Sequence, residues 1–285
     1  MWQDIFNKHA IQDAEAILVI SDLNDAFKFF TPRDKIRETK NLFKFLKSLA
    51  NKKRPIIFPA FTHSFGKTGI FDVLKTRPEQ MGTLPLMAFK DQSLYRTLSP
   101  ITSYFIWPHC GDFIFNKFTT TFGETSLFGW LNKRKCRIIC IGKIPDHKLG
   151  WIGVHHSEEI NKVPYRFFKI FFGTIIAANK EEHSVTQYHY ARRREMKIKN
   201  DFSLLNRALS ENGLRVNFNQ NGIDISSVWC SDLMLVSDSL IRSDPFAHTK
   251  YEFNSVCKTH LSVIICRSLS LSIFPFLLIG FSFTR

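Results

Sequence analysis

Two histidines stand next to each other in the segment GVHHSEEI, residues 153–160, and a glutamate follows each of them three positions later. The pairs are His155 with Glu158 and His156 with Glu159. Residues three apart in a helix lie on the same face. A histidine can accept a proton near neutral pH, and a carboxylate on its other ring nitrogen would fix the tautomer. The segment is therefore either a base with its orienting carboxylate or the polar face of a solvated helix, because H-x-x-E also occurs by chance.

Three apolar runs predict buried strands around this segment. They cover residues 16–21 (AILVIS), 55–61 (PIIFPAF) and 136–142 (CRIICIG). Between the first two runs, apolar residues recur at helical spacing over residues 33–50, at Ile36, Leu42, Phe43, Leu46 and Leu49. A strand, a crossover helix and a second strand form the parallel unit of an α/β fold. The order of elements therefore predicts an α/β fold class.

Polar side chains stand where two of these strands end. Ser21 closes the first strand, and Thr62 and Ser64 follow the second. Ligands of open α/β sheets bind outside the carboxyl ends of the strands. The three hydroxyls are therefore candidate ligand-binding groups, with ordinary strand-end turns as the alternative. The third strand leads through a loop into the segment with the two histidines, which is a suitable layout for an active site.

The chain is basic, with 39 Lys and Arg residues against 25 Asp and Glu residues and a net charge of +14. Its basic clusters are short, at residues 52–54, 133–135 and 192–194. No known nucleic-acid-binding motif accompanies them, so we expect no nucleic-acid partner. A positive surface still attracts anionic small molecules such as nucleotides.

The six cysteines form no C-x-x-C pair and have no regular spacing, which argues against a structural zinc or other metal site. Cys136 and Cys140 lie in an apolar run where buried thiols are common. No activating partner is evident for Cys110, Cys136 or Cys140, so none of them is assigned as a nucleophile. The N-terminus lacks a charged-then-apolar export signal, which predicts a cytoplasmic protein.

Six sequence blocks between about residues 17 and 194 occur in an order that is specific although each block alone is modest. They are FPAFT (58–62), FDVLKTRPEQMGTLP (71–85), RTLSPITSY (96–104), FGETSLFGWL (122–131), VHHSEE (154–159) and KVPYRFFKIFFG (162–173). Their order and separations resemble the aminoglycoside 3-N-acetyltransferase family. The resemblance is closest to the family's relatives in surface-polysaccharide gene clusters.

The resemblance implies a three-layer α/β/α sandwich with a mixed, largely parallel central sheet. It also implies an N-acetyltransferase that moves an acetyl group from acetyl-CoA to a sugar amine. The family's general base is the histidine of a T-x-x-H-x-x-E pattern, with the glutamate nearby. Alignment by the Val-Pro-Tyr-Arg end of the segment matches His155 and Glu158 to that pair. His156 with Glu159 stays open because its spacing is the same, and Tyr165 and Arg166 are interpreted as a structural block after the site.

The same resemblance places five residues toward acetyl-CoA, which are Ser21, Thr62, Ser64, Arg96 and Ser103. Backbone amides or hydroxyls at the strand ends could donate hydrogen bonds to the oxyanion that forms from the thioester. For Arg96 the alternative role is to brace a loop.

Several positions depart from the family's motifs. The threonine expected three residues before the base is Ile152, or Gly153 if His156 is the base. Further departures lie at Ile20-Ser21-Asp22, which lacks the family's histidine, at Arg77-Pro78-Glu79 and at Ser99. These departures leave a catalytically silent relative that binds a sugar or CoA as an alternative to an enzyme.

Charge complementarity separates two kinds of acceptor. Aminoglycosides are polycations, and a protein of net charge +14 attracts them poorly at long range. An amino sugar linked to a nucleotide or a lipid is anionic and suits this charge better. The sequence therefore favours an amino-sugar acetyltransferase of polysaccharide assembly, with an aminoglycoside 3-N-acetyltransferase of antibiotic resistance as the alternative.

The composition changes near the C-terminus. Residues 1–255 are expected to form the acetyltransferase-like domain, and residues 256–285 an apolar tail. The most apolar part, residues 269–283, contains Pro275 and falls short of the roughly 20 residues that span a bilayer. The tail is a buried hairpin, a peripheral membrane contact or, as we favour, a segment foreign to the family fold. The sequence does not predict an oligomeric state.

Overall fold

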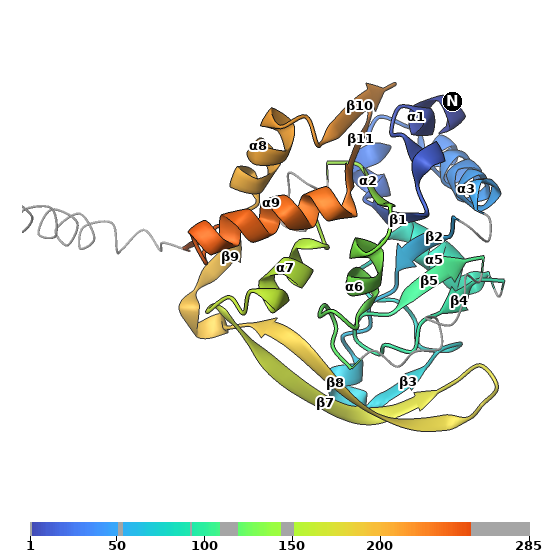
Figure 1. The fold of residues 1–285 in the computed structure, drawn as a ribbon. Coiled ribbons are helices and arrows are strands. Elements are labelled where there is room, and N and C mark those ends of the chain that lie inside the picture. The colour runs from blue at the N-terminus through green and yellow to red at the C-terminus, as the bar shows by residue number, and fades with distance from the viewer. Residues whose placement is uncertain (1, 51–53, 92, 109–118, 144–150, 252–285) are drawn as a thin grey trace, which may run out of the picture.

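The computed structural model describes residues 2–50, 54–91, 93–108, 119–143 and 151–251 (Figure 1). Its centre is a seven-stranded sheet in the order β10-β11-β6-β1-β2-β5-β4. These strands are β1 (Ala16–Ser21), β2 (Ile56–Pro59), β4 (Tyr95–Arg96), β5 (Tyr104–Trp107), β6 (Cys136–Ile141), β10 (Val216–Gln220) and β11 (Ile223–Trp229). The three strands predicted from apolar runs are β1, β2 and β6.

The central sheet is mixed, as expected, but only its middle is parallel. β1 pairs in parallel with both β2 and β6, whereas the other four pairings of the sheet are antiparallel. The description "largely parallel" is therefore corrected. The antiparallel part includes the hairpin of β10 and β11, which needs no crossover helix. Asn221 and Gly222 form its turn with φ of 55° and 78°, the left-handed backbone that Asn-Gly hairpin turns require.

Helices cover both faces of this sheet, which confirms the three-layer α/β/α sandwich (Figure 1). Along β1, Ile17 and Val19 pack into one core, and Leu18 and Ile20 pack into the other, because successive side chains of a strand point to opposite faces. The first core lies against α1 (Trp2–Asn7), α2 (Leu23–Ala26), α3 (Pro32–Leu49) and α5 (Thr83–Lys90). The second lies against α6 (Leu127–Asn132), α7 (Val154–Ile160), α8 (Ser203–Glu211) and α9 (Cys230–Ser243).

The predicted crossover helix is α3. Thr31 caps its N-terminus, because its hydroxyl accepts a hydrogen bond from the backbone N–H of Asp34, and Pro32 occupies the first turn. The expected apolar positions are buried with one exception. Ile36 is 60% exposed. It lies six residues before Leu42, so it points about 120° away from that buried face of the helix.

A second, three-stranded sheet lies at one side of the molecule (Figure 1). It consists of β3 (Ile70–Asp72), β7 (Arg166–Ile176) and β8 (Glu182–Arg192), and β7 and β8 form a long antiparallel hairpin. The sequence did not predict this hairpin. The remaining elements are α4 (Phe65–Thr68), η1 (Ile11–Asp13), η4 (Arg194–Met196), and the pair β9 (Ile198–Asn200) and β12 (Thr249–Tyr251).

None of the helices in the described part of the chain combines the length and the apolar character needed to cross a bilayer. The predicted apolar tail, residues 256–285, and the predicted boundary between residues 255 and 256 lie outside the described residues.

Candidate functional site

The two histidines lie on α7, which the packing of its other side holds in place. Val154 and Ser157 are fully buried, and the Ser157 hydroxyl lies 3.5 Å from the sulfur of Met234 on α9. At Gly153, just before the helix, a Cβ atom would come within 2.9 Å of Leu233. A larger residue there would require the Leu233 side chain to move. The close contact with α9 therefore sets which way each side chain of α7 points.

His155 and Glu158 meet on the other side of α7. The Nδ1 atom of His155 lies 2.5 Å from Oε2 of Glu158. An ionised carboxylate can only accept, so Nδ1 carries the proton and donates it to this hydrogen bond. The Nε2 atom is then left with a lone pair, and it has no hydrogen-bond partner among the described residues. The side chain of His155 is 19% exposed, whereas that of Glu158 is completely buried.

Two residues, one just before β7 and one at its start, bind the same carboxylate. The Tyr165 hydroxyl donates to Oε1 of Glu158 at 2.8 Å, and Nη2 of Arg166 lies 2.8 Å from Oε2. Arg166 is fixed in turn by a 3.0 Å hydrogen bond from Nη1 to the backbone carbonyl of Tyr190. Tyr165 and Arg166, which we interpreted as structural, therefore contact the candidate site directly. The signal in the sequence was their position seven and eight residues after Glu158.

These contacts determine the charges in the pair. Burial raises the pKa of Glu158, but Arg166 and His155 lower it more, so that the net pKa lies well below its usual value. Burial lowers the pKa of His155, and Arg166 lowers it further against the opposing effect of Glu158. At neutral pH the pair is therefore a carboxylate and a neutral imidazole, which is the form that a general base needs.

The second pair, His156 and Glu159, does not meet. His156 is buried, and its Nδ1 donates to the backbone carbonyl of Phe122 at 2.5 Å. Glu159 is also buried and accepts hydrogen bonds from the Phe122 backbone and from the Thr120 side chain. Both residues thus bind the segment before α6. Of the two pairs with equal spacing, the fold brings together only His155 and Glu158.

A further histidine lies beside His155, although the sequence analysis did not single it out. The Phe122 ring lies 5.1 Å from the His155 ring and 6.1 Å from the ring of His189 on β8. The Thr121 hydroxyl is 3.1 Å from Nδ1 of His189. Burial and the nearby Arg166 lower the pKa of His189 to about 3, so this imidazole is neutral. No local motif marks His189, because it approaches the site only through the β7–β8 hairpin.

Three of the five residues predicted to face acetyl-CoA are buried and donate to backbone carbonyls, and two of them, Arg96 and Ser103, form one cluster. The Ser103 hydroxyl donates to the carbonyl of Ala60 at 2.5 Å, and Arg96 donates to the same carbonyl at 3.0 Å and to Ser103 at 3.1 Å. The Thr62 hydroxyl donates to the carbonyl of Pro100. All three side chains are buried, and their hydrogen bonds hold the backbone after β2 and before β5.

Arg96 shows the bracing role most clearly. It also donates to the carbonyl of Thr76, and its guanidinium lies over the ring of Phe71 at 4.7 Å. Burial lowers the pKa of Arg96 to about 9, which still leaves it positive at neutral pH. These contacts fit the alternative role of bracing the loop, and the role of Arg96 toward acetyl-CoA stays a prediction.

The other two predicted residues lie in separate places. The Ser21 hydroxyl, at the end of β1, is buried and has no hydrogen-bond partner within the described part of the chain. Ser64 precedes α4, and its backbone N–H donates to the carboxylate of Glu79 at 3.1 Å. Ser21 and Ser64 are thus neither joined to each other nor part of the Arg96 cluster.

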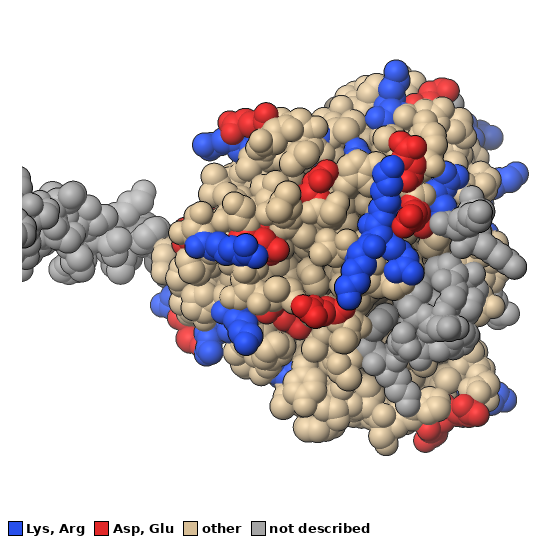
Figure 2. Space-filling model, viewed as in Figure 1, with Lys and Arg blue, Asp and Glu red and all other residues tan. Residues whose placement is uncertain are grey.

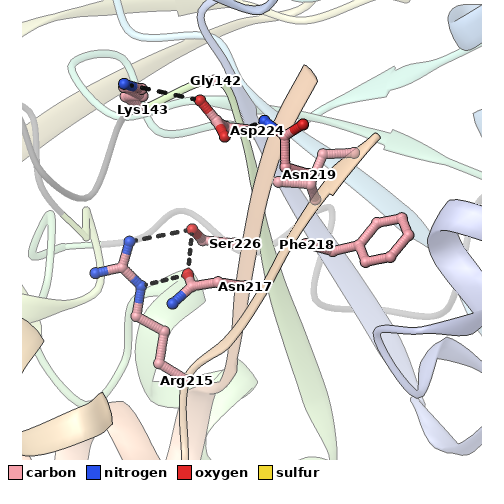
Figure 3. Close-up of a pocket in the computed structure, with 9 residues that line it drawn as sticks. Gly142, Lys143, Arg215, Asn217, Phe218, Asn219, Asp224 and Ser226 are labelled. Carbon is pink, nitrogen blue, oxygen red and sulfur yellow. Dashed lines mark hydrogen bonds and ion pairs between the residues drawn. The ribbon is translucent and has the colours of Figure 1, made fainter. Parts of the chain in front are cut away.

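A polar pocket of about 380 Å³ opens beside the hairpin of β10 and β11 (Figure 3). It is lined by Gly142, Lys143, Arg215, Asn217, Phe218, Asn219, Asp224, Ile225 and Ser226. Arg215 donates to Asn217 at 2.8 Å and to Ser226 at 3.1 Å. None of the residues predicted as site residues lines this pocket.

Thiol and metal chemistry find little support in the described ranges. Burial raises the pKa of Cys136 well above its usual value and that of Cys230 to about 12, so neither is a thiolate at neutral pH. Within those ranges no three His, Cys, Asp or Glu side chains gather in a way that could hold a metal ion. Cys110 lies outside the described residues.

Comparison of the sequence with protein families identifies the class of this fold. Residues 53–234 match the model of the family described as aminoglycoside 3-N-acetyltransferase, which is more than half of the 285 residues. The chain therefore belongs to the aminoglycoside 3-N-acetyltransferase family. It is an N-acetyltransferase that uses acetyl-CoA. No curated protein matches the chain.

Solved structures share the fold at low sequence identity. One is sisomicin-bound AAC-VIa, with 10% identity and a TM-score of 0.64 over 84% of this chain and 95% of that chain. Another is AAC-IIIb in a binary complex with CoASH, with 13% identity and a TM-score of 0.61 over 82% and 92%. A third is the YokD protein from Bacillus subtilis, with 14% identity and a TM-score of 0.61 over 85% and 99%.

Proposed function

We propose that this protein transfers the acetyl group of acetyl-CoA to an amine of an aminoglycoside, with His155 as the general base and Glu158 as its orienting carboxylate. The observation that carries the proposal is the 2.5 Å hydrogen bond between Nδ1 of His155 and the fully buried Glu158 carboxylate. It leaves a neutral imidazole whose other nitrogen can accept a proton. The match to the family supports the same reaction.

In the proposed reaction the amine nitrogen attacks the thioester carbonyl carbon that acetyl-CoA supplies. The Nε2 atom of His155 accepts the proton that the amine loses, and Glu158 stabilises the resulting imidazolium. The carbon–sulfur bond then breaks, and the imidazolium returns its proton to the departing thiolate. The products are an amide and a free thiol. No acyl-enzyme forms, in keeping with the raised pKa values of the buried thiols of Cys136 and Cys230.

The contacts of the predicted acetyl-CoA residues divide them into two groups in this proposal. Ser21 and Ser64 remain candidates to contact acetyl-CoA, since each lies at the carboxyl end of a central strand. Thr62, Arg96 and Ser103 hold backbone carbonyls after β2 and before β5. The buried thiols agree with a protein of the reducing cytoplasm, where acetyl-CoA is made available to such an enzyme.

The family and the ligands of related structures support an aminoglycoside as the acceptor. Structures with a similar fold hold sisomicin and apramycin. The competing candidate is an amino sugar linked to a nucleotide or a lipid, which the net charge of +14 and the resemblance to relatives in surface-polysaccharide gene clusters favour. Acidic and basic side chains are interspersed on the face shown in Figure 2, so a cationic acceptor does not meet a uniformly positive surface there.

Thiol release from acetyl-CoA tests the reaction and the acceptor together. The panel contains aminoglycosides, nucleotide-linked amino sugars and free amino sugars, and the variants are His155→Ala and His156→Ala. His183→Ala is the matched control, because His183 lies on β8 away from the pair. We expect release with aminoglycosides that is lost in His155→Ala and kept in His183→Ala.

Other outcomes would overturn parts of the proposal. Release with a nucleotide-linked amino sugar alone would replace the acceptor. Loss in a folded His156→Ala protein, with activity kept in His155→Ala, would move the base by one residue. Binding of acetyl-CoA without release for any acceptor would identify a catalytically silent relative.

A further inference from the structure

His156 and Glu159, which do not contact each other, both bind the backbone of Phe122. His156 donates from Nδ1 to the carbonyl of Phe122 at 2.5 Å. A hydrogen bond from the Phe122 backbone lowers the pKa of Glu159, so it stabilises the ionised carboxyl and comes from the N–H group. Two residues on one side of α7 thus bind both the donor and the acceptor of a single residue in the loop before α6.

A glycine in this loop, Gly123, allows Glu159 to come close to the backbone. At Gly123 a Cβ atom would lie 2.5 Å from Oε1 of Glu159 and 2.6 Å from the Thr120 hydroxyl. Neither separation is possible between real atoms, so the glycine lets the carboxyl approach the loop. The Thr120 hydroxyl also donates to Glu159. Oε1 of Glu159 therefore lies close to the loop at Thr120 and Gly123.

The second oxygen of Glu159 shows that this arrangement is unusual for a structural residue. Oε2 is buried and has no hydrogen-bond partner within the described residues. Burial raises the pKa of Glu159 to about 7, against the opposing hydrogen bonds from Phe122 and Thr120. A buried carboxyl with an unsatisfied oxygen destabilises a fold. Its position beside Phe122 points to a role in holding that residue.

The side chain of Phe122, whose backbone His156 and Glu159 bind, contacts His155. Its ring is buried and contacts the His155 ring edge-on, with 5.1 Å between the ring centres. It also lies beside His189, the other neutral imidazole at the site. Because an apolar ring covers one side of the His155 imidazole, it keeps water from that side and contributes to the burial that lowers the pKa of His155.

We infer that His156 and Glu159 are positioning residues, which hold the ring of Phe122 against His155 and so keep the base neutral and oriented. This inference rests on the proposed function, in which His155 is the base. It explains why the segment HHSEE contains two pairs with the same spacing. His155 and Glu158 take part in the proposed reaction. His156 and Glu159 hold the Phe122 ring, against which His155 packs.

Other charged groups also act on His155, and the test must separate their effects. They are Glu158 on α7, Arg166 on β7, His189 and Arg192 on β8, and His248 before β12. None of them is changed in the variants used. The direction of the shift then separates two mechanisms. Loss of a nearby negative charge would lower the pKa of His155, whereas loss of the covering ring would raise it.

The experiment is an NMR titration of the His155 ring in the full chain, with His155→Gln used to assign the signal. The variants are Phe122→Leu, Phe122→Ala, Glu159→Ala and Glu159→Gln. Glu124→Gln is the matched control, because Glu124 is an exposed carboxylate of the same loop. Thermal unfolding of each variant shows that it is folded at the titration temperature, and kcat and KM for acetyl-CoA are measured alongside.

We expect the pKa of His155 to rise by about 0.5 to 1 unit in Phe122→Ala, a fraction of the 3 to 5 units that complete burial produces. Glu159→Ala should raise it in the same direction, although Glu159 is not among the main groups that act on His155 directly. Glu159→Gln keeps an oxygen that can accept from the Phe122 N–H, so the pKa of His155 in this variant should equal that of the wild type. Phe122→Leu should lie between wild type and Phe122→Ala.

A double variant gives the sharpest result. If Glu159 acts through Phe122, the shift in Phe122→Ala combined with Glu159→Ala equals that of Phe122→Ala alone, because coupled residues are not additive. We also expect kcat to fall by roughly tenfold in Glu159→Ala while KM for acetyl-CoA changes little, since misplacement of a base affects the chemical step. Glu124→Gln should change neither quantity.

Three results would overturn the inference. They are a lowered or unchanged pKa of His155 in a folded Glu159→Ala protein, additive shifts in the double variant, and an equal effect of Glu159→Gln and Glu159→Ala. The titration requires no turnover. Failure of the proposed function, seen as unchanged activity in His155→Ala, is therefore distinguishable from failure of this inference.

Discussion

Replacement of Glu158 by glutamine removes one negative charge from the centre of the site and keeps the shape of the side chain. Glu158 is completely buried and binds three groups, which are Nδ1 of His155, the Tyr165 hydroxyl and Nη2 of Arg166. A glutamine oxygen can still accept from His155 or Arg166. It cannot neutralise Arg166, whose side chain is only 6% exposed.

The structure sets the size of two expected effects. An arginine left buried without its counter-ion destabilises a fold by roughly 3 to 5 kcal/mol, and the hydrogen bonds that glutamine keeps place the expected loss near the lower value. In the reaction, the imidazolium loses a charged hydrogen-bond partner worth about 1.5 to 3 kcal/mol. That free energy corresponds to a fall in kcat of roughly 10- to 150-fold.

The assays are thiol release from acetyl-CoA and unfolding in urea over a range of pH. The control is Glu195→Gln, which removes one partner of the exposed pair between Arg193 and Glu195, 3.6 Å apart. That change should cost at most about 1 kcal/mol. A folded Glu158→Gln protein with wild-type kcat would refute the role of Glu158, and one with wild-type stability would refute the buried ion pair.

The pH dependence of stability gives an independent check on Glu158. Its pKa in the folded protein lies well below its usual 4.5, because the effects of Arg166 and His155 exceed the opposing effect of burial. The folded state therefore binds fewer protons than the unfolded state as the pH falls below about 4.5. The stability that Glu158 contributes is fully present above that pH and is lost on acidification. The difference between wild type and Glu158→Gln should accordingly shrink as the pH falls.

Three further predictions concern residues outside the pair. Burial and Arg137 lower the pKa of His9 from 6.5 to about 4. The free energy of unfolding should therefore fall by up to about 3 kcal/mol as the pH is lowered from 6.5 to 4, because only the unfolded state binds this proton. In urea titrations, His9→Gln should remove that part of the fall. Arg96→Met should destabilise the protein by about 2 to 3 kcal/mol, measured by the urea midpoint, because the Thr76 carbonyl loses its charged donor and the Ala60 carbonyl keeps only Ser103. Cys136 and Cys230 should stay unmodified by a thiol reagent in the native protein and react after unfolding, as mapped by mass spectrometry, since burial raises the pKa of each thiol; modification at native conditions would show that they are accessible.

Much of the central architecture can be predicted from the sequence. The apolar runs that predict the first three strands correspond to β1, β2 and β6, because strands buried on both faces need continuous apolar residues. The predicted crossover helix forms with a threonine cap and a proline in its first turn. Such local patterns depend only on neighbours along the chain. The antiparallel pairings at the edges of the sheet were missed, since the partner and direction of a strand depend on residues far away in the sequence.

The environment of the candidate site could not be predicted in the same way. Burial of Arg96 among backbone carbonyls follows from the way β2, β4 and β5 come together. The approach of His189 follows from the β7–β8 hairpin, whose strands carry exposed and buried residues without a simple alternation. These contacts join residues far apart in the sequence, so no local spacing encodes them.

By itself the sequence determined that a histidine and a glutamate three residues apart would share one face of a helix, because that spacing is close to one helical turn. It determined this equally for His155 with Glu158 and for His156 with Glu159. Only the tertiary structure decided between them. The packing of α7 against α9 turns His155 and Glu158 toward Arg166 on β7, and it turns His156 toward the carbonyl of Phe122. A helix has a fixed spacing but no fixed rotation about its own axis, and the neighbouring elements supply that rotation.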